Sequence, residues 1–196
     1  MPHRLSSRAA TALSLAALSP LAGASGFAII EQGVDGLGNA YAGGAAAADS
    51  PATVFFNPAG LTRLDGTRLQ AAAHAVIPTA DFADQGSTIN PDLPPNIGGG
   101  APLPGGDDDG GTLVGVPNLY LTHRINERWA AGLGVNAPFG LETRYDEGWA
   151  GRYHAIDSEL RTINVNPSVA FQATEHLSLG LGVNAQYIDA RLTNAL

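Results

Sequence analysis

The feature that most constrains this chain is a strict alternation of two kinds of side chain in its second half. In residues 177–187 every odd position holds Leu, Val, Ala or Tyr, and every even position holds Ser, Gly, Asn or Gln. Residues 129–137 and 163–171 show the same two-residue period, with small or amide side chains opposite the apolar ones. Such a period places one kind of residue on each face of an extended strand, so these segments predict β-strands with one apolar face.

The second face of these strands indicates the surroundings that they need. Alternation fits either a soluble β-sandwich, with a core and water, or a membrane barrel, with lipid and a lumen. Strands that face water normally carry charged side chains, whereas these faces carry glycine, asparagine, serine and glutamine. Segments of about ten residues also have the length of a tilted strand that crosses a bilayer. We therefore expect an all-β fold, a transmembrane antiparallel β-barrel, with the soluble sandwich as the alternative.

The alternating segments and the turn residues between them predict five strands. We expect these strands at residues 69–77, 116–125, 128–138, 160–172 and 176–191. Short turns near Asn126 and Thr174 separate two pairs of them, while residues 78–115 and 140–158 are expected to form long loops. Outer-membrane barrels have the same asymmetry, with short turns on the periplasmic side and long loops outside the cell.

The first 24 residues have the composition of a cleaved signal peptide. Arg4 and Arg8 precede a short apolar run at 9–18, and small residues at 22–24 provide a cleavage site, so the mature chain is expected to begin at Ser25. The formal net charge of −8, without a basic cluster, argues against nucleic acid as a partner. The chain has no cysteine, which excludes disulfides, and no run of eighteen apolar residues that would predict a membrane helix.

Residues 26–61 are rich in glycine and alanine and follow neither the period of a helix nor that of a strand. Glycines allow tight bends there, and the Asn57-Pro58 step restricts the backbone and removes one hydrogen-bond donor. A segment of this kind cannot build a core of its own, so we expect it to pack inside the barrel as a plug. The predicted organisation is a signal peptide at 1–24, a plug or hatch at 25–67 and a partial barrel at 68–196.

Four motifs extend this interpretation: SGF at 25–27, GLGNAY at 36–41, AAAADSPATVFFNPAGL at 45–61 and GWAGRYHAIDSELRTINVNPSVAF at 148–171. They resemble the FadL/TodX family of outer-membrane transporters, which move long-chain fatty acids and aromatic hydrocarbons. The resemblance implies a fourteen-stranded barrel with an N-terminal hatch in the outer membrane of a Gram-negative bacterium. Five strands cannot close such a barrel, and Leu196 is not the usual terminal aromatic residue. We therefore expect the N-terminal part of a longer protein.

The resemblance also implies a gate in the barrel wall. In the family, the hatch motif lies against a kink in the third strand, beside a lateral opening. Pro138 cannot donate to a strand ladder and Gly140 weakens one, so a break in the third strand also follows from the residues themselves. The other interpretation is an ordinary turn proline and a strand end. The predicted gate residues are Asn57, Pro58, Ala59, Asn136, Pro138 and Gly140.

Apolar and aromatic residues near the plug and in the second long loop are candidate ligand contacts. In the family, an aromatic residue near the mature N-terminus lies at the ligand pocket, and Phe27 matches it. Loop aromatics beside Arg144 and Arg152 could receive the carboxylate of an amphipathic ligand. Plug packing and an aromatic girdle fit these residues equally well. The predicted ligand-binding residues are Phe27, Ile29, Phe55, Phe56, Trp149 and Tyr153.

Signals for metal binding or catalysis are weak. Residues 107–109 carry three carboxylates that could hold Ca²⁺, but without the spacing of an EF-hand, and a solvated loop is the simpler interpretation. Tyr41 stands where a dinucleotide fingerprint needs its third glycine, and neither a zinc-protease motif nor a nucleophile elbow is present. We expect no enzyme, no metal and no cofactor.

Together these patterns predict a passive outer-membrane transporter of the porin-like, plugged kind. Its partners would be long-chain fatty acids or aromatic hydrocarbons and the lipid of the outer membrane, and its ligand would leave sideways near Asn57 and Pro138. One alternative is a structural or adhesive outer-membrane barrel. A less favoured one is an outer-membrane lipid hydrolase.

Overall fold

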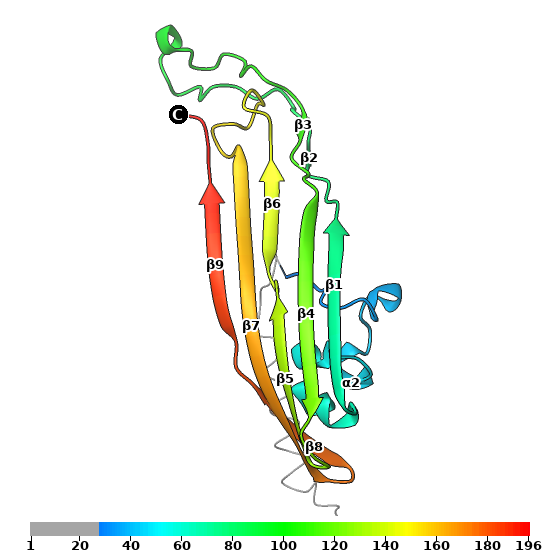
Figure 1. Cartoon of the computed structure of the whole chain (residues 1–196). Helices are drawn as coiled ribbons and strands as arrows, with labels where there is room; N and C mark the ends of the chain where they lie inside the picture. Colours follow the sequence, from blue (N-terminus) through cyan, green and yellow to red (C-terminus); the bar gives the residue numbers. More distant parts are fainter. Residues whose placement is uncertain (1–27) are drawn as a thin grey trace, which may run out of the picture.

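The computed structural model describes residues 28–196, and an antiparallel sheet forms most of it (Figure 1). The predicted signal peptide lies outside the described residues. In the sheet, β5 and β6 both pair with one side of β7, and β8 and β9 both pair with the other side. The sheet therefore has five rows of strands, in the order β1, β4, β5/β6, β7 and β8/β9, and we call this sheet the wall. The strands are β1 (Thr67–Val76), β4 (Val114–Arg124), β5 (Trp129–Asn136), β6 (Gly140–Arg144), β7 (Asp157–Thr174), β8 (Leu177–Gly182) and β9 (Ala185–Leu192).

The five predicted strands match these five rows, and two of the rows are interrupted. The prediction of one long loop over residues 140–158 is wrong for its first residues. Gly140–Arg144 pair with residues 157–161 and form β6, because the third row resumes after a short break. The first long loop contains only β2 (Asp81–Phe82), η4 (Pro95–Ile97) and β3 (Asp108–Asp109).

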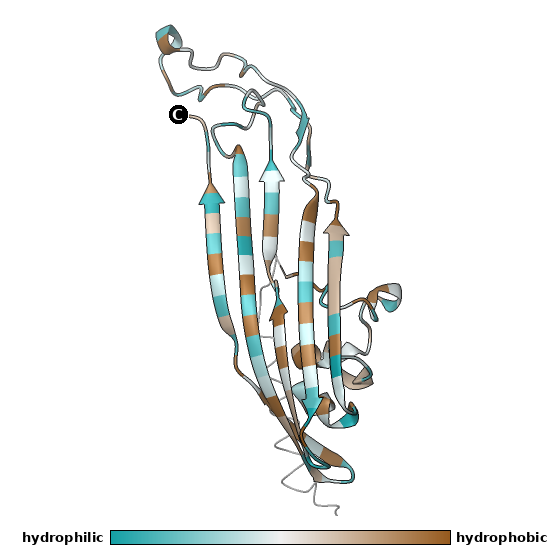
Figure 2. Cartoon of the chain, in the orientation of Figure 1, coloured by the Kyte–Doolittle hydropathy of each residue, from teal (hydrophilic) through white to brown (hydrophobic). Residues whose placement is uncertain are grey.

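The two faces of the sheet differ as the alternation predicts. In β4, Asn118, Tyr120 and Thr122 are buried on one face, while Leu119 and Leu121 are exposed on the other. Figure 2 shows this alternation as bands along β4 and β7. We call the face that carries Tyr120 the inner face and the opposite one the outer face.

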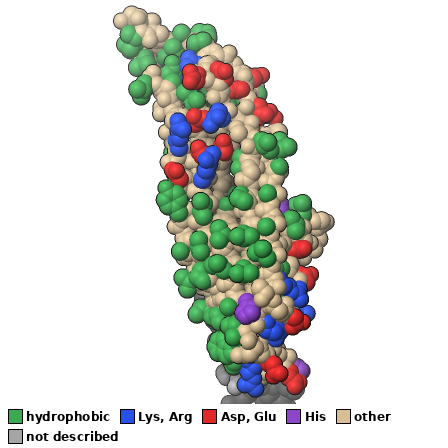
Figure 3. All heavy atoms as spheres, viewed as in Figure 1, with side chains coloured by type: hydrophobic (Ala, Val, Ile, Leu, Met, Phe, Trp, Pro, Cys, Tyr) green, Lys and Arg blue, Asp and Glu red, His purple; other side chains and the backbone are tan. Residues whose placement is uncertain are grey.

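The outer face carries a continuous apolar band (Figure 3). Cross-strand pairing places Leu69, Leu121, Leu133 and Pro167 side by side on β1, β4, β5 and β7. At the end of the sheet with the short turns, Trp129 and Phe171 pack with ring centroids 4.7 Å apart. An exposed apolar surface of this extent is typical of a protein surrounded by lipid.

Charged side chains lie above this band, towards the long loops, and others lie below it, at the end of the sheet with the short turns (Figure 3). Arg144 pairs with Asp157 at 2.8 Å, and Arg161 lies 3.7 Å from Glu142 and also pairs with Glu159. The apolar band thus ends where charges begin, as expected at the edge of a bilayer.

A plug segment, residues 28–66, packs against the part of the inner face nearer the short turns, and it consists of short turns rather than long helices (Figure 1). These are η2 (Leu37–Asn39), α2 (Gly44–Ala47), α3 (Thr53–Phe56) and η3 (Pro58–Arg63). Val54 and Leu61 are fully buried against Tyr120, Ala130 and Ala170 of the sheet. No helix within residues 28–196 is long and apolar enough to cross a membrane.

Glycines on the inner face allow the plug segment to approach the sheet closely. A Cβ atom at Gly132 would lie 2.6 Å from Val54 Cγ2, and one at Gly134 would lie 3.2 Å from Val54 Cγ1. A larger residue at Gly132 would therefore push the plug segment away from the sheet. This contact explains why small residues alternate with apolar ones in β5.

Candidate functional site

The third row of the sheet is broken between β5 and β6. Asn136, the last residue of β5, pairs with Asn164, and Gly140, the first residue of β6, pairs with Arg161. Residues 137–139 therefore lie opposite only two residues of β7, which is the arrangement of a β-bulge. One extra residue reverses the alternation, so odd positions face inward in β6 whereas even positions do in β5.

The backbone groups of this first break are satisfied from the inner side by the start of the plug segment. Ile29 N–H donates to Pro138 O at 2.9 Å, and Ala28 forms an antiparallel bridge with Phe139. The Gln32 side chain donates to Ala137 O at 3.0 Å. Because an unsatisfied carbonyl in an apolar environment costs several kcal/mol, these contacts close the break.

One side chain of β7 completes the closure. The Thr162 hydroxyl oxygen accepts the Phe139 N–H at 3.1 Å and donates to the Phe139 carbonyl. Thr162 is buried on the inner face, and its partner Phe139 forms the bridge with Ala28 of the plug segment. The backbone groups of residues 137–139 are thus hydrogen-bonded partly to β7 and partly to the plug segment.

A chain of buried amide side chains runs from the plug segment across the inner face. Tyr120 OH donates to Gln32 Oε1 at 3.4 Å, and Asn136 Nδ2 donates to Tyr120 OH at 3.2 Å. Asn164 Nδ2 then donates to Asn136 Oδ1 at 3.2 Å and to Asn184 Oδ1 at 3.0 Å. Gln32 and Tyr120 have no solvent-exposed surface. This network links the plug segment to four rows of the sheet: β4, β5/β6, β7 and β8/β9.

The inner face changes character above the first break, towards the long loops. Leu141 pairs with Leu160, which pairs with Ala190, and Ile188 pairs with the inward-facing Thr162. Because cross-strand partners share a face, these side chains form an aliphatic inner surface. The amide-bearing surface around Asn164 lies directly below it.

The row formed by β8 and β9 has a second break. β8 ends with Gly182 opposite Ser168, and β9 begins with Ala185 opposite Val165. Val183 N–H donates to Pro167 O at 3.0 Å, but Pro167 has no N–H to return. The Asn166 side chain donates to Val183 O at 3.1 Å instead.

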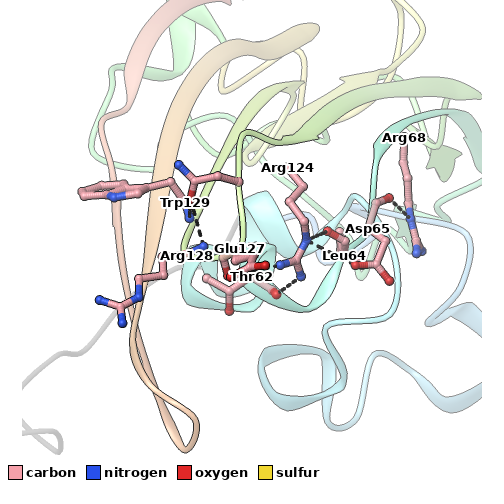
Figure 4. Close-up of polar contacts among 9 residues, drawn as sticks. Thr62, Leu64, Asp65, Arg68, Arg124, Glu127, Arg128 and Trp129 are labelled. Atoms are coloured by element: carbon pink, nitrogen blue, oxygen red, sulfur yellow. Dashed lines mark hydrogen bonds and ion pairs between the residues drawn. The ribbon is translucent and has the colours of Figure 1, made fainter.

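The other end of the plug segment is fixed by Arg124, a half-buried arginine of β4 (Figure 4). Arg124 Nε donates to Leu64 O at 3.1 Å, and its Nη2 donates to Thr62 O. The guanidinium also lies 3.2 Å from the Asp65 carboxylate. A charged, planar donor that binds several carbonyls at once holds the chain firmly.

The predicted gate residues fall into two groups. Asn136, Pro138 and Gly140 lie at the first break, where the side chain of Ile29 packs against Gly140. The Asn57-Pro58-Ala59 motif instead packs against Gly180 of β8. Asn57 caps η3 by accepting the Ala59 N–H at 3.2 Å, and it donates to Ala45 O at 2.8 Å.

The predicted ligand residues are also dispersed. Ile29 lies at the first break, and Phe27 lies outside the described residues. Phe55 and Phe56 pack against the core between plug segment and sheet. Trp149 is only 8% exposed, and Tyr153 is 46% exposed with Arg152 over its ring.

Trp149 joins the two long loops to each other. Its ring stacks on Tyr145 at 4.0 Å and meets the edge of Phe82 at 4.9 Å. Burial, and secondarily the nearby Asp109, raises the pKa of the Tyr145 hydroxyl, which donates to Ala80 O at 2.9 Å. These contacts leave little of the Trp149 ring for a ligand.

The acidic loop, residues 107–109, is held in place by hydrogen bonds between its carboxylates and backbone N–H groups. Asp109 Oδ1 accepts the N–H groups of Ala80 at 2.8 Å and Gly111 at 2.9 Å, and these bonds lower the pKa of its carboxyl group. Within residues 28–196, no cluster of histidine, aspartate and glutamate could hold a metal ion. The carboxylates shape the loop.

One further titratable group lies in the plug segment. Tyr41 OH donates to Gly33 O at 2.6 Å, and its ring stacks on Phe56. Burial, followed by the charges of Glu31 and Asp35, raises the pKa of the Tyr41 hydroxyl. Tyr41 therefore remains neutral at physiological pH and holds the middle of the plug segment.

Several residues at the breaks were not singled out from the sequence. They are Gln32, Tyr120, Thr162, Asn164 and Asn166. The amide side chains on one face of residues 163–171 indicated a hydrogen-bonded network, but the residues that they bind lie in distant parts of the chain. Only one feature of the sequence pointed to Gln32: it is an amide in a stretch of small and apolar residues.

Comparison with known proteins agrees with this geometry. Residues 15–196 match the model of the family "Outer membrane protein transport protein (OMPP1/FadL/TodX)". Outer membrane protein P1 of Haemophilus influenzae is 36% identical over 186 residues, which are 93% of this chain and 40% of that protein. The long-chain fatty acid transport protein of Escherichia coli is 31% identical over 190 residues, which are 96% of this chain and 39% of that protein.

A solved structure supports the same conclusion. A Pseudomonas aeruginosa FadL homologue matches with a TM-score of 0.63 and 26% identity, over 86% of this chain and 39% of that one. An antiparallel wall with an apolar outer face and a segment packed inside defines a plugged outer-membrane β-barrel. The chain belongs to the OMPP1/FadL/TodX family of outer-membrane transport proteins, a family of transporters and not of enzymes. It spans about 40% of the length of the curated relatives that it matches.

Proposed function

We propose that the protein carries long-chain fatty acids, or aromatic hydrocarbons, passively across the outer membrane. One observation carries this proposal. The wall is broken at residues 137–139, and the start of the plug segment closes the break from inside. An apolar compound gains nothing from a water-filled pore, whereas an exit towards lipid keeps it out of water.

The inner surface above the break suits such a compound. The aliphatic side chains of Leu141, Leu160 and Ile188 lie on the inner face, between the long loops and the break. A hydrocarbon chain that enters from the loop side would meet apolar contacts first and the closed break next. Movement of residues 28–32 away from residues 137–139 would then open the wall.

The Asn57-Pro58-Ala59 motif has a different part in this proposal. Its contacts with Ala45 and β8 support a role in holding the plug segment together, rather than in covering the break. We further propose the division into signal peptide (1–24), plug (25–67) and wall (68–196).

The test locks the start of the plug segment onto the break. Ala28 and Phe139 form a non-hydrogen-bonded antiparallel pair, in which Cα atoms lie about 4.5 Å apart, within the range of a disulfide. The chain has no cysteine of its own. We would combine Ala28→Cys with Phe139→Cys in the full-length protein and measure uptake of labelled oleate and toluene by cells lacking their own transporter.

We expect uptake by the parent protein, loss of uptake when the engineered pair is oxidised, and recovery on reduction. The Ala28→Cys variant alone is the matched control and should transport under both conditions. Uptake that is unaffected by the cross-link would show that the exit lies elsewhere. A parent protein that takes up neither compound would overturn the transport proposal.

A further inference from the structure

We propose that Gln32 is the latch of the plug segment: its carboxamide holds residues 28–32 against the first break and sets how readily they leave it. This inference rests on the proposed function, because a latch has a purpose only if the break opens. Gln32 has no exposed surface, and it is the side chain of the plug segment that donates to the backbone of the break.

The hydrogen bonds of Gln32 join three parts of the molecule. Its Nε2 donates to Ile29 O and to Ala137 O, both at 3.0 Å, and its Oε1 accepts from Tyr120 OH at 3.4 Å. The first bond folds the plug segment back on itself, and the second ties this fold to the broken row. The backbone N–H of Gln32 also donates to Ile30 O at 2.7 Å, which tightens the same turn.

Chemistry favours an amide at this position. A carboxamide offers two N–H groups and one oxygen, and here both N–H groups donate and the oxygen accepts. An aliphatic side chain would leave the Ala137 carbonyl unsatisfied, and a carboxylate would place an acceptor against two carbonyls. The bonds are neutral and therefore of moderate strength, which suits a contact that has to break repeatedly.

The network behind Gln32 supports it from the wall. Tyr120 is held by Asn136, and Asn136 by Asn164, so the acceptor side of Gln32 is anchored to β4, β5 and β7. Removal of the Tyr120 hydroxyl should therefore weaken the latch, but less than removal of the Gln32 amide.

A matched control exists on β1. Gln70 also holds the plug segment through its carboxamide: its Oε1 accepts the Ala52 N–H at 3.1 Å and its Nε2 donates to Asp35 at 2.8 Å. These contacts are made at Asp35 and Ala52, and neither involves the backbone of residues 137–139. Gln70→Ala should loosen the plug segment locally without affecting residues 28–32.

The measurement uses the engineered pair Ala28→Cys with Phe139→Cys in the purified full-length protein. Equilibration in glutathione redox buffers gives the effective concentration of one thiol at the other, which is proportional to the docked population. We expect Gln32→Ala to lower this effective concentration about tenfold, as the loss of two neutral hydrogen bonds implies. Tyr120→Phe should lower it about threefold, and Gln70→Ala should leave it within about twofold.

Tyr120→Phe keeps the buried ring and provides a test if Gln32→Ala does not assemble. Effective concentrations that do not change in either variant would overturn the latch, and so would an equal fall in Gln70→Ala, because the effect would then be general loosening. The redox titration involves no substrate, so it is independent of transport. Absence of oleate uptake by the parent protein would count against the transport proposal alone.

Discussion

The two breaks in the wall lie on either side of β7 and are closed in different ways. At the first break, residues 137–139 receive hydrogen bonds from Ile29 and Gln32 of the plug segment and from Thr162. At the second break, the wall closes itself, because the Asn166 side chain replaces the N–H that Pro167 lacks. The first break therefore depends on contacts from the plug segment, which we propose leaves it during transport, whereas the second break does not.

The largest expected effect comes from releasing the fixed end of the plug segment. Arg124→Ala removes the donor for the buried carbonyls of Thr62 and Leu64, and we expect a loss of about 3 kcal/mol in the free energy of unfolding. The cross-link between residues 28 and 139 should weaken as well, while the second break should remain closed. Denaturant titration of the folded barrel measures the first effect, and the redox titration measures the second.

The control for Arg124 is Arg68, an exposed arginine that donates to the Asp65 carbonyl at 3.2 Å. Arg68→Ala should cost less than about 0.5 kcal/mol, because exposed contacts contribute little. Equal losses in the two variants would contradict the assignment of Arg124 as the anchor of the plug segment.

Thr162→Val should be next in size and should affect the first break alone. Valine has nearly the same shape but neither accepts from Phe139 N–H nor donates to its carbonyl, so we expect a loss of about 2 kcal/mol in unfolding free energy. Thr122 provides the comparison, because it is buried on the same face and its hydroxyl has no partner within the described residues. Thr122→Val should be neutral or stabilising, and the opposite ranking would rule out this explanation.

Asn166→Ala tests the second break and should cost about 1 kcal/mol, since one neutral donor to the Val183 carbonyl is lost. Pro167→Val supplies a backbone N–H that can reach the same carbonyl. The double variant should therefore recover most of the loss, which a double-mutant cycle of unfolding free energies would measure. If the two changes were simply additive, Asn166 would not be the substitute donor.

The smallest effect on stability is expected from lowering the pH. It should destabilise the loop that contains Asp109 and leave both breaks unchanged. Hydrogen bonds from Ala80 and Gly111 lower the pKa of Asp109 in the folded protein. A lowered folded pKa stabilises the loop above the unfolded value of about 3.9, and this contribution is lost as the pH falls through the folded pKa. Gln32, Thr162 and Asn166 carry no acidic group, so the breaks should not respond.

The fluorescence of Trp149, in a Trp129→Phe background, would report the loop, because Trp149 stacks on Tyr145 and Tyr145 binds Ala80. Asp109→Asn keeps an acceptor oxygen without the titration and should flatten the profile below pH 4, about the pKa of free aspartate. A profile that is identical in the two proteins would assign the acid response to another group.

Much of the wall could be predicted from the sequence alone. Alternation at residues 129–137, 163–171 and 177–187 located three rows and distinguished their faces, because a strand exposes successive side chains to opposite sides. Pro138 predicted the first break for an equally local reason, the missing N–H. The absence of charge on the inner face and the motifs at residues 36–61 and 148–171 indicated a plugged barrel.

What closes the breaks was decided only by the tertiary structure. Gln32 reaches a carbonyl 105 positions away in the chain, and Arg124 binds carbonyls about 60 positions away, so no local pattern identifies either contact. The β6 strand was missed because its few residues are extended only through pairing with β7. Local alternation determines which face a residue occupies, whereas hydrogen bonds between distant segments determine how each break in the wall is closed.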